Sequence, residues 1–292
     1  MPELPEVEAL VRFLDLRTKG RRLSRLELAS FAALKTVQPA LDELLGLEIV
    51  EWQRRGKYLC LATDGPWLVV HLARAGWVKW YDNLPRASAR PGRGPLALRV
   101  RLEPDDAGET APGFDLTEVG TEKRLSLWVV DDPDRIEAVA SLGVDPLDPT
   151  FDRETLAELL CVAPGTIKSA LTSQSLVAGV GNAYSDEVLH AARVSPFRPA
   201  RSLSKAEVAT LHKALVDTLG AAVAERAGLE AGHLQREKRS ALRVHGRSGS
   251  ACPVCGDTIC EVAFATRSLH YCPTCQTGGR RLADRRLSRL LK

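Results

Sequence analysis

Apolar residues in the first part of the chain recur first at helical and then at strand spacing. Between residues 6 and 16, Val7, Leu10, Val11 and Leu14 occupy positions i, i+3, i+4 and i+7. Side chains at this spacing share one face of a helix, so the pattern predicts an amphipathic helix with that face buried.

Short runs of alternating apolar and polar residues, bounded by Gly, Pro and Asp, follow this helix. They predict β-strands at residues 23–29, 48–53, 58–62, 67–71, 76–81, 96–102 and 125–130. Residues 83–95 are rich in Pro, Gly, Arg and Ser, and residues 103–113 are acidic, so both stretches are expected to be loops. Together, the strands and turns indicate a mostly antiparallel β-sandwich.

The pattern turns helical after residue 152. Ser204 and Glu207 have the spacing of a capping box, which predicts a helix from this point to about residue 226. Asn182 is expected to be the N-cap of an earlier helix, and short strands are expected around the last cysteines. The chain is therefore predicted to be α+β, with a β-sandwich at 1–149, a helical domain at 150–232 and a C-terminal domain at 233–292.

Composition and charge narrow the class of protein. Of 292 residues, 45% are hydrophobic and 26% are charged, which is typical of a globular protein. Residues 233–292 carry twelve Lys/Arg against four Asp/Glu, whereas residues 100–160 carry five against sixteen. A basic tail of this density favours a polyanionic partner. Because no apolar run approaches the roughly 20 residues of a membrane span and no signal pattern is present, a cytoplasmic protein without membrane association is expected.

Four of the seven cysteines have the spacing of metal ligands. Cys252 and Cys255 form one C-x-x-C pair, and Cys272 and Cys275 form a second after sixteen intervening residues. Four thiolates make a closed tetrahedral zinc site, which leaves no position for a catalytic water. We therefore predict one structural Zn²⁺. Arg267 is expected near the tip of the hairpin between the two pairs, where it would suit a phosphate.

The first residues, Met-Pro-Glu-Leu-Pro-Glu, offer unusual chemistry. If Met1 is removed, Pro2 presents a secondary amine, which is nucleophilic when neutral and forms an iminium with a sugar aldehyde carbon. Glu3 is adjacent and suited to proton transfer. The alternative is a frayed terminus in which Pro5 merely occupies the first turn of a helix.

Two Gly-containing turns are candidate phosphate sites. Arg54, Arg55 and Lys57 surround Gly56 before a strand, although a solvated turn explains them equally well. The stretch Gln174–Glu187 contains Gly-Val-Gly-Asn ahead of a helix, whose N-terminus would offer backbone N–H groups to an anion. Such a turn also serves simply to join two helices.

Taken together, these motifs resemble the formamidopyrimidine-DNA glycosylase/endonuclease VIII family. The resemblance rests on the Pro-Glu-Leu-Pro-Glu-Val start, Arg-Gly-Lys-Tyr at 55–58, the segment 179–187, Val-His-Gly-Arg at 244–247 and the two C-x-x-C pairs. These span nearly the whole chain in the order of the family. The resemblance implies a β-sandwich, a helical domain with a helix–two-turn–helix motif and a zinc finger, with damaged double-stranded DNA bound in a cleft.

The resemblance also implies the residues that carry the reaction. Pro2 would be the Schiff-base nucleophile at C1′, and Glu3 the general acid/base. Lys57 would lie beside a phosphate and assist β-elimination, with Arg267 in the same catalytic group.

Contacts to the DNA backbone follow from the same motifs. Asn182 and Arg267 would hold the phosphates that flank a nucleotide flipped out of the base stack, with Lys168 nearby. The partner is thus damaged duplex DNA, bound by a monomer that is associated with the nucleoid when it acts.

Two loops depart from the pattern of the purine-excising members. Those members carry a Met after His-Leu, where this chain has Arg74, and Arg-Arg-Phe after Asp-Pro, where it has Asp134, Arg135 and Ile136. Arg74 or Arg135 is therefore expected to fill the gap left by the flipped base, since a guanidinium stacks on bases. The change extends the expected lesions to oxidised pyrimidines and abasic sites.

The resulting interpretation is a bifunctional DNA glycosylase/AP lyase of base-excision repair, cutting the strand by β- or β,δ-elimination. The alternative from another class is a non-catalytic protein that binds damaged or abasic DNA. The altered loops motivate this alternative.

Overall fold

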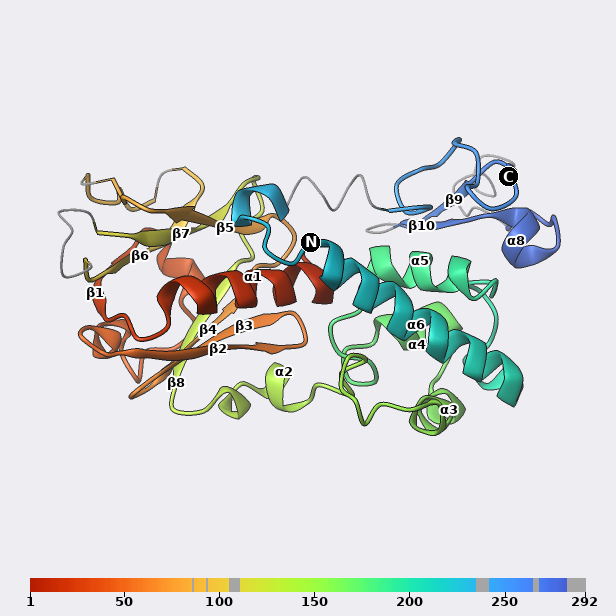
Figure 1. Cartoon of the computed structure of the whole chain (residues 1–292), viewed down its shortest axis with the longest axis horizontal. Helices are drawn as coiled ribbons and strands as arrows, with labels where there is room; N and C mark the ends of the chain where they lie inside the picture. Colours follow the sequence, from red (N-terminus) through yellow and green to blue (C-terminus); the bar gives the residue numbers. More distant parts are fainter. Residues whose placement is uncertain (86, 93, 105–110, 235–241, 265–267, 283–292) are drawn as a thin grey trace. The chain divides into compact units, whose positions relative to one another are not determined.

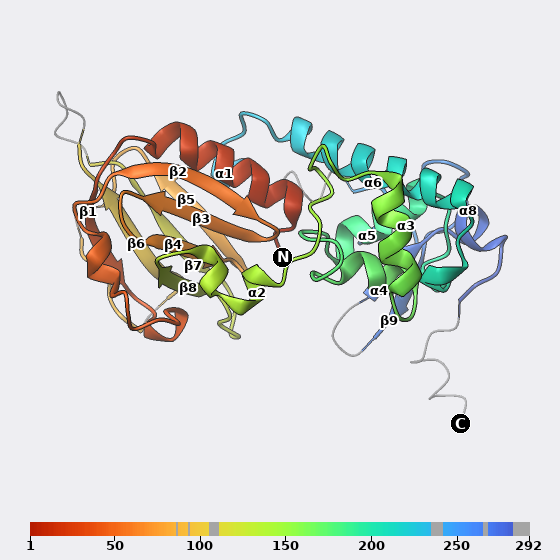
Figure 2. The same cartoon turned by 90° about the horizontal axis from the view of Figure 1, so that it is seen from below.

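The computed structural model describes residues 1–292 except 86, 93, 105–110, 235–241, 265–267 and 283–292. The chain divides into two compact units, drawn in two views in Figures 1 and 2. Unit 1 is Met1–Ser141 with Arg226–Glu237, and unit 2 is Leu142–Glu225 with Lys238–Lys292.

Unit 1 is built on two four-stranded antiparallel sheets. One has the order β1-β6-β7-β5 and the other β2-β3-β4-β8. Their strands are β1 Leu23–Leu28, β2 Ile49–Arg55, β3 Tyr58–Thr63, β4 Trp67–His71, β5 Gly76–Tyr81, β6 Leu96–Leu102, β7 Gly113–Glu118 and β8 Ser126–Val130. The predicted antiparallel sandwich is confirmed.

Helix α1 (Leu4–Thr18) packs against β2 and β3. Val7, Leu10 and Leu14 are completely buried and join side chains of both sheets in one core. The predicted apolar face is therefore correct, but the helix begins two residues earlier than expected. Pro5 lies in its first turn, where the missing N–H of proline costs no intrahelical hydrogen bond.

Strand β7 was missed by the sequence analysis, which left its residues between a loop and the next strand. It lies between β6 and β5 in the middle of its sheet. Its centre holds a charged residue, Asp115, which forms two 2.8 Å hydrogen bonds with the Arg99 guanidinium of β6. Both side chains are buried, and each charge is satisfied by the other. In the sequence alone, a charged residue at this position is typical of a loop.

Residues 226–234 return to unit 1 after the long helix α6. The Trp77 indole N–H donates to the carbonyl of Ala231 at 2.7 Å, and Ala231 and Leu234 join the sandwich core. An exposed ion pair of 2.7 Å between Arg17 and Glu230 links the same segment to α1.

Unit 2 contains helices and a small hairpin. Its elements are α3 Arg153–Val162, α4 Ile167–Thr172, α5 Asn182–Ala191, α6 Lys205–Glu225, β9 Cys260–Ala263, β10 Ser268–Tyr271 and α8 Pro273–Thr277. Unit 1 also carries the four-residue helix α2 (Glu137–Ala140). The capping box at the start of α6 is formed, because the Ser204 N–H donates to the Glu207 carboxylate at 2.8 Å. Overall, the α+β class is as predicted.

The position of Asn182 differs from the prediction by one residue. Gly181 is the N-cap of α5, and Asn182 is the first helical residue. The Asn182 side chain instead donates to the backbone carbonyl of Ser268 in β10. Within the described ranges, no helix is both long and apolar enough to cross a bilayer.

Candidate active site and zinc centre

The N-terminal residues are held in place. Pro2 and Glu3 are buried, and the Glu3 backbone N–H donates to the Glu6 carboxylate at 2.9 Å. Glu6 itself has no exposed surface. The terminus is therefore anchored at the first turn of α1, which argues against a frayed end.

Lys57 occupies the tight turn between β2 and β3. Arg55 pairs with Tyr58, and Gly56, with φ of +55°, takes the first of the two turn positions. Because φ is positive at Gly56 but not at Lys57, the turn is of type II′, whose first position glycine adopts without strain. The turn buries Lys57, of which only 7% is exposed.

His71 is a neighbour of Lys57 to which the sequence analysis gave no role. It pairs with Tyr58 across β3 and β4, and the two rings lie 4.8 Å apart. Burial, followed by the positive charge of Lys57, lowers the pKa of His71 to about 4. His71 is therefore a neutral imidazole beside the Lys57 ammonium at neutral pH.

Arg54 fastens the same hairpin to α1. Its guanidinium Nε lies 2.7 Å from the Glu8 carboxylate, which also binds Arg12 at 2.8 Å. Burial alone would raise the pKa of Glu8, but the hydrogen bonds and charges of Arg54 and Arg12 lower it overall. Of the three basic residues in this motif, Arg54 thus has a structural partner, whereas Arg55 is exposed. Both views place this hairpin and the start of α1 at the same end of the sandwich (Figures 1 and 2).

Arg74 and Arg135 lie on two loops of unit 1, and both are exposed. The Arg74 loop is closed by a 2.8 Å hydrogen bond from the Gly76 N–H to the Leu72 carbonyl. Arg135 ends a short 3-10 turn whose N-cap, Asp132, accepts the Asp134 N–H. Ile136, at the position of the family's Phe, is only 7% exposed. Both arginines thus belong to the solvent-exposed side chains of these loops.

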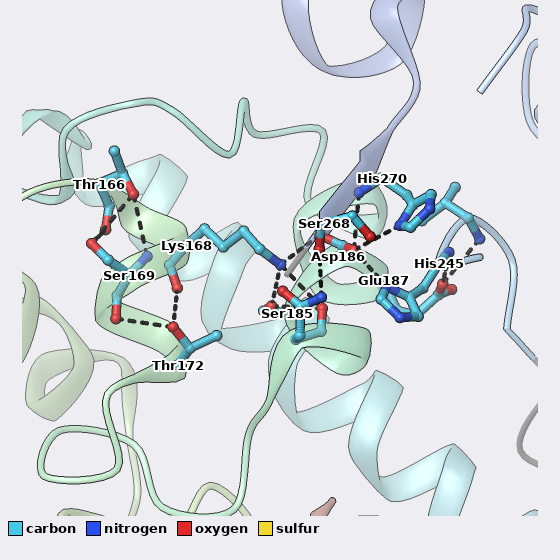
Figure 3. A network of polar contacts seen from close by, with 12 residues as sticks. Thr166, Lys168, Ser169, Thr172, Ser185, Asp186, Glu187, His245, Ser268 and His270 are labelled. Atoms are coloured by element: carbon cyan, nitrogen blue, oxygen red, sulfur yellow. Dashed lines mark hydrogen bonds and ion pairs between the residues drawn. The ribbon is translucent and has the colours of Figure 1, made fainter. Parts of the chain in front are cut away.

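In unit 2, the ammonium of Lys168 lies in a buried network between α4 and α5 (Figure 3). It donates to Asp186 Oδ1 at 2.6 Å, to Ser185 Oγ at 2.7 Å and to the Asn182 carbonyl at 3.1 Å. Lys168 and Asn182, two predicted DNA contacts, are therefore brought together. Lys168 is directed at α5.

Asp186 joins this network to the C-terminal region. Its Oδ2 accepts the His245 ring Nδ1–H at 2.7 Å and the His270 backbone N–H at 3.0 Å (Figure 3). Burial alone would raise the pKa of Asp186, but bonds from His245, His270 and Lys168 lower it to about 2. The carboxylate is thus ionised at neutral pH.

Glu187 fixes the Val-His-Gly-Arg motif in a similar way. Its carboxylate accepts the backbone N–H groups of Arg243, Val244 and His245 at 2.8 to 2.9 Å. Together with the bonds from Asn182 to Ser268 and from Asp186 to His270, helix α5 holds both the start of β10 and this loop. The sequence showed these acidic residues only as part of a helix.

The predicted phosphate site at the Gly-Val-Gly-Asn turn is partly closed by the chain itself. The Gly179 N–H donates to the Gln174 side-chain oxygen at 3.0 Å, and the Gln174 amide donates to the Val180 carbonyl at 2.7 Å. Gly179 has a φ of +83°. The Gln174 side chain therefore closes the turn with two hydrogen bonds. Arg267 lies outside the described residues.

The four cysteines converge as the spacing predicted. All four Sγ atoms lie within 4.8 Å of one another, with 3.8 Å between Cys252 and Cys275 and 3.4 Å between Cys255 and Cys272. Four sulfurs about 2.3 Å from a tetrahedral zinc lie about 3.8 Å apart, so the set fits Zn²⁺. The site is closed and structural, as predicted.

His190 is a further neighbour of this centre. Its Nε2 lies 3.2 Å from the Cys252 Sγ, and burial lowers the pKa of the ring. In the tautomer protonated at Nε2, the neutral ring donates a hydrogen bond to the sulfur. Such contacts orient metal ligands, and here one links α5 to the zinc finger.

Comparison with known families agrees with this arrangement. The chain matches the N-terminal domain of formamidopyrimidine-DNA glycosylase at residues 1–131, its H2TH domain at 142–231, and the zinc finger found in FPG and IleRS at 249–278. A β-sandwich, a helix–two-turn–helix and a Cys₄ finger in this order define the class as zinc-containing DNA glycosylases of base-excision repair.

Full-length relatives identify the family. The formamidopyrimidine-DNA glycosylase of Symbiobacterium thermophilum is 37% identical, over 94% of this chain and 89% of the relative. An uncharacterized formamidopyrimidine-DNA glycosylase-like protein of Mycobacterium tuberculosis is 55% identical over 52% of this chain and 95% of its own length. The chain therefore belongs to the formamidopyrimidine-DNA glycosylase family, which confirms the resemblance found in the sequence.

A solved structure has the same fold. The Lactococcus lactis formamidopyrimidine-DNA glycosylase, bound non-covalently to DNA containing an AP site, matches with a TM-score of 0.78 and 28% identity. The match covers 94% of this chain and 99% of that one.

Proposed function

We propose that this protein, once Met1 is removed, is a bifunctional DNA glycosylase and abasic-site lyase. The observation that carries the proposal is the burial of Pro2 and Glu3, together with the hydrogen bond from the Glu3 N–H to the Glu6 carboxylate. A nucleophile contributes to catalysis when its geometry is set before the substrate arrives. The anchored terminus meets that requirement.

The reaction follows from a secondary amine at this position. The Pro2 nitrogen attacks C1′, the bond from C1′ to the base breaks, and the base leaves with the bonding electrons. Glu3 transfers the proton that opens the sugar ring, which yields an iminium at C1′. Because the iminium withdraws electrons, a C2′ proton is lost and the 3′ C–O bond breaks. A second elimination removes the 5′ phosphate, and water then releases the amine.

Positively charged residues would support the elimination. Lys57 would hold a phosphate and stabilise its charge as it leaves, and the neutral His71 beside it would add no second charge. We propose Asn182 and Arg267 as the contacts to the phosphates around the flipped nucleotide. Lys168 would act mainly through Asn182 and Asp186, which its ammonium binds.

The proposed partner is damaged double-stranded DNA, bound by a monomer at the nucleoid. We propose the division into a catalytic sandwich at 1–149, a helical domain at 150–232 and a zinc finger at 233–292. The Lactococcus lactis relative with its AP-site DNA supports this partner. Because Arg74 and Arg135 are both exposed on their loops, we propose that one or the other fills the gap in the stack. Oxidised pyrimidines and abasic sites join oxidised purines as substrates.

Borohydride trapping on a duplex with one abasic site tests the proposal. We expect a covalent complex from protein whose N-terminal mass shows the loss of Met1. Pro2→Gly, whose primary amine is less well placed, should reduce trapping at least about tenfold.

The result that would contradict the proposal is tight binding without a covalent adduct, measured with correctly processed, zinc-loaded protein. That result would replace the enzyme with a non-catalytic binder of abasic DNA, which the altered loops would then explain.

A further inference from the structure

A buried ion pair lies directly behind the N-terminus. The Arg226 Nε lies 3.5 Å from the Glu6 Oε1, and the two side chains are 1% and 0% exposed. The other Glu6 oxygen, Oε2, accepts the Glu3 N–H at 2.9 Å. One carboxylate therefore connects Arg226, more than two hundred residues away in the chain, to the residue that follows Pro2.

Burying this ion pair costs free energy, so its main role is not to stabilise unit 1. Two charges withdrawn from water lose several kcal/mol of hydration each, and their attraction commonly does no more than offset that loss. Apolar residues of similar volume would stabilise unit 1 equally well. A buried ion pair does fix the orientation of both side chains, because each charge is stable only next to the other.

We propose that Arg226 is a positioning residue for the candidate nucleophile, acting through Glu6. Covalent geometry places the Pro2 nitrogen within about 4 Å of the Glu3 nitrogen, so Glu6 and Pro2 are close neighbours. Arg226 holds the Glu6 carboxylate in position, and Glu6 fixes the backbone from which the Pro2 amine projects. The inference rests on the proposed function, since it assumes that Pro2 attacks C1′.

The simpler role for Arg226 is to dock residues 226–234 onto the sandwich. That docking has other support, namely the Trp77 hydrogen bond to Ala231 and the burial of Leu234. The Arg17–Glu230 ion pair links the same segment to α1 and is partly exposed. Arg17→Gln is therefore a matched control, which removes an arginine from the same interface without touching Glu6.

The experiment compares Arg226→Gln, Arg226→Lys and Arg17→Gln in the full-length, zinc-loaded protein. One readout is the single-turnover rate of borohydride trapping on an abasic duplex. The other is the Kd for a duplex with a stable tetrahydrofuran abasic analogue. We expect Arg226→Gln to lower the trapping rate about 10- to 100-fold, the cost of a nucleophile misplaced by about 1 Å. Its Kd should stay within about threefold of wild type.

Arg226→Lys, which keeps the charge, should recover most of the rate, and Arg17→Gln should match wild type. If Arg226→Gln unfolds, the double variant Glu6→Gln/Arg226→Gln replaces the ion pair by two neutral amides. It should fold and still trap slowly, with no additional loss beyond a single substitution.

Retention of the wild-type trapping rate in Arg226→Gln, or in the folded double variant, would overturn the inference. A rate that falls only in proportion to DNA affinity would overturn it as well. Failure of the wild-type protein itself to trap is a different result, which removes the proposed function and this inference with it.

Discussion

Replacing Asp186 by Asn should destabilise unit 2 far more than its single lost charge suggests. The carboxylate is completely buried and receives Lys168, the His245 ring and the His270 N–H, so it joins α4, α5, β10 and the 243–245 loop. An amide keeps the shape but presents an N–H to one of these donors and leaves the Lys168 ammonium without its ion-pair partner. Breaking a buried pair in this way costs about 3–5 kcal/mol.

The lowered pKa of Asp186 is a second indication that this carboxylate stabilises the folded state. A carboxyl whose pKa is lowered from 3.8 to about 2 on folding contributes on the order of 2 kcal/mol of stability at neutral pH. Because the folded pKa is the lower one, this contribution is complete above about pH 4 and is lost as the pH falls toward 2. Asp186→Asn should therefore lower the midpoint of thermal unfolding by about 10 °C at pH 7. It should also flatten the fall in stability between pH 4 and pH 2.

The measurement is urea unfolding with zinc present, followed by far-ultraviolet circular dichroism and by tryptophan fluorescence. All five tryptophans belong to unit 1, so fluorescence reports that unit while the helical signal is weighted toward unit 2. Asp217→Asn is the matched control, because its carboxylate also binds a lysine at 2.6 Å but is 59% exposed. Exposed pairs contribute up to about 1 kcal/mol. Equal, small effects of the two substitutions would refute the structural role assigned to Asp186.

Two further outcomes are expected. Removal of zinc by a chelator, or Cys255→Ser, should abolish binding to an abasic duplex. Metal analysis should give one zinc per wild-type chain, and undiminished DNA binding by metal-free protein would show that the finger does not contribute. Gly76→Ala should destabilise unit 1 by at least about 2 kcal/mol, because the added Cβ would lie 2.1 Å from the Leu72 carbonyl oxygen. Gly232→Ala, where an added Cβ meets nothing within 4 Å, is the control, and equal thermal midpoints would contradict this explanation.

The sequence predicts much of this fold because most of its elements are locally consistent. The α1 stripe, the capping box at Ser204 and Glu207, and the strands at 67–71, 76–81 and 96–102 agree with the structure. The zinc ligands were predictable for the same reason, since their chemistry depends on spacing within short segments. In each case the residues that specify the element belong to the same short segment of the sequence.

The missed features all depend on partners that are distant in the sequence. Asp115 marks β7 as polar until Arg99 is placed opposite it on β6. Residues 226–234 follow the end of a predicted helix, and nothing local in their sequence shows that they pack on Trp77 and the core of unit 1. No local pattern indicates that Arg226 is buried, because a lone arginine at the end of a helix is ordinarily exposed.

Two buried ion pairs of this chain share one arrangement that bears on its function. Lys168 with Asp186 and Arg226 with Glu6 each lie one contact away from a residue proposed to touch DNA or the sugar, namely Asn182 and Glu3. Apolar packing would stabilise the same positions, but it would offer no hydrogen-bond partner to the polar groups beside them. The Lys168–Asp186 pair is hydrogen-bonded, and the Arg226–Glu6 pair brings its two charges to 3.5 Å, so each pair restrains the carboxylate that it contains. These pairs therefore make more sense as devices that orient the groups beside them than as sources of stability.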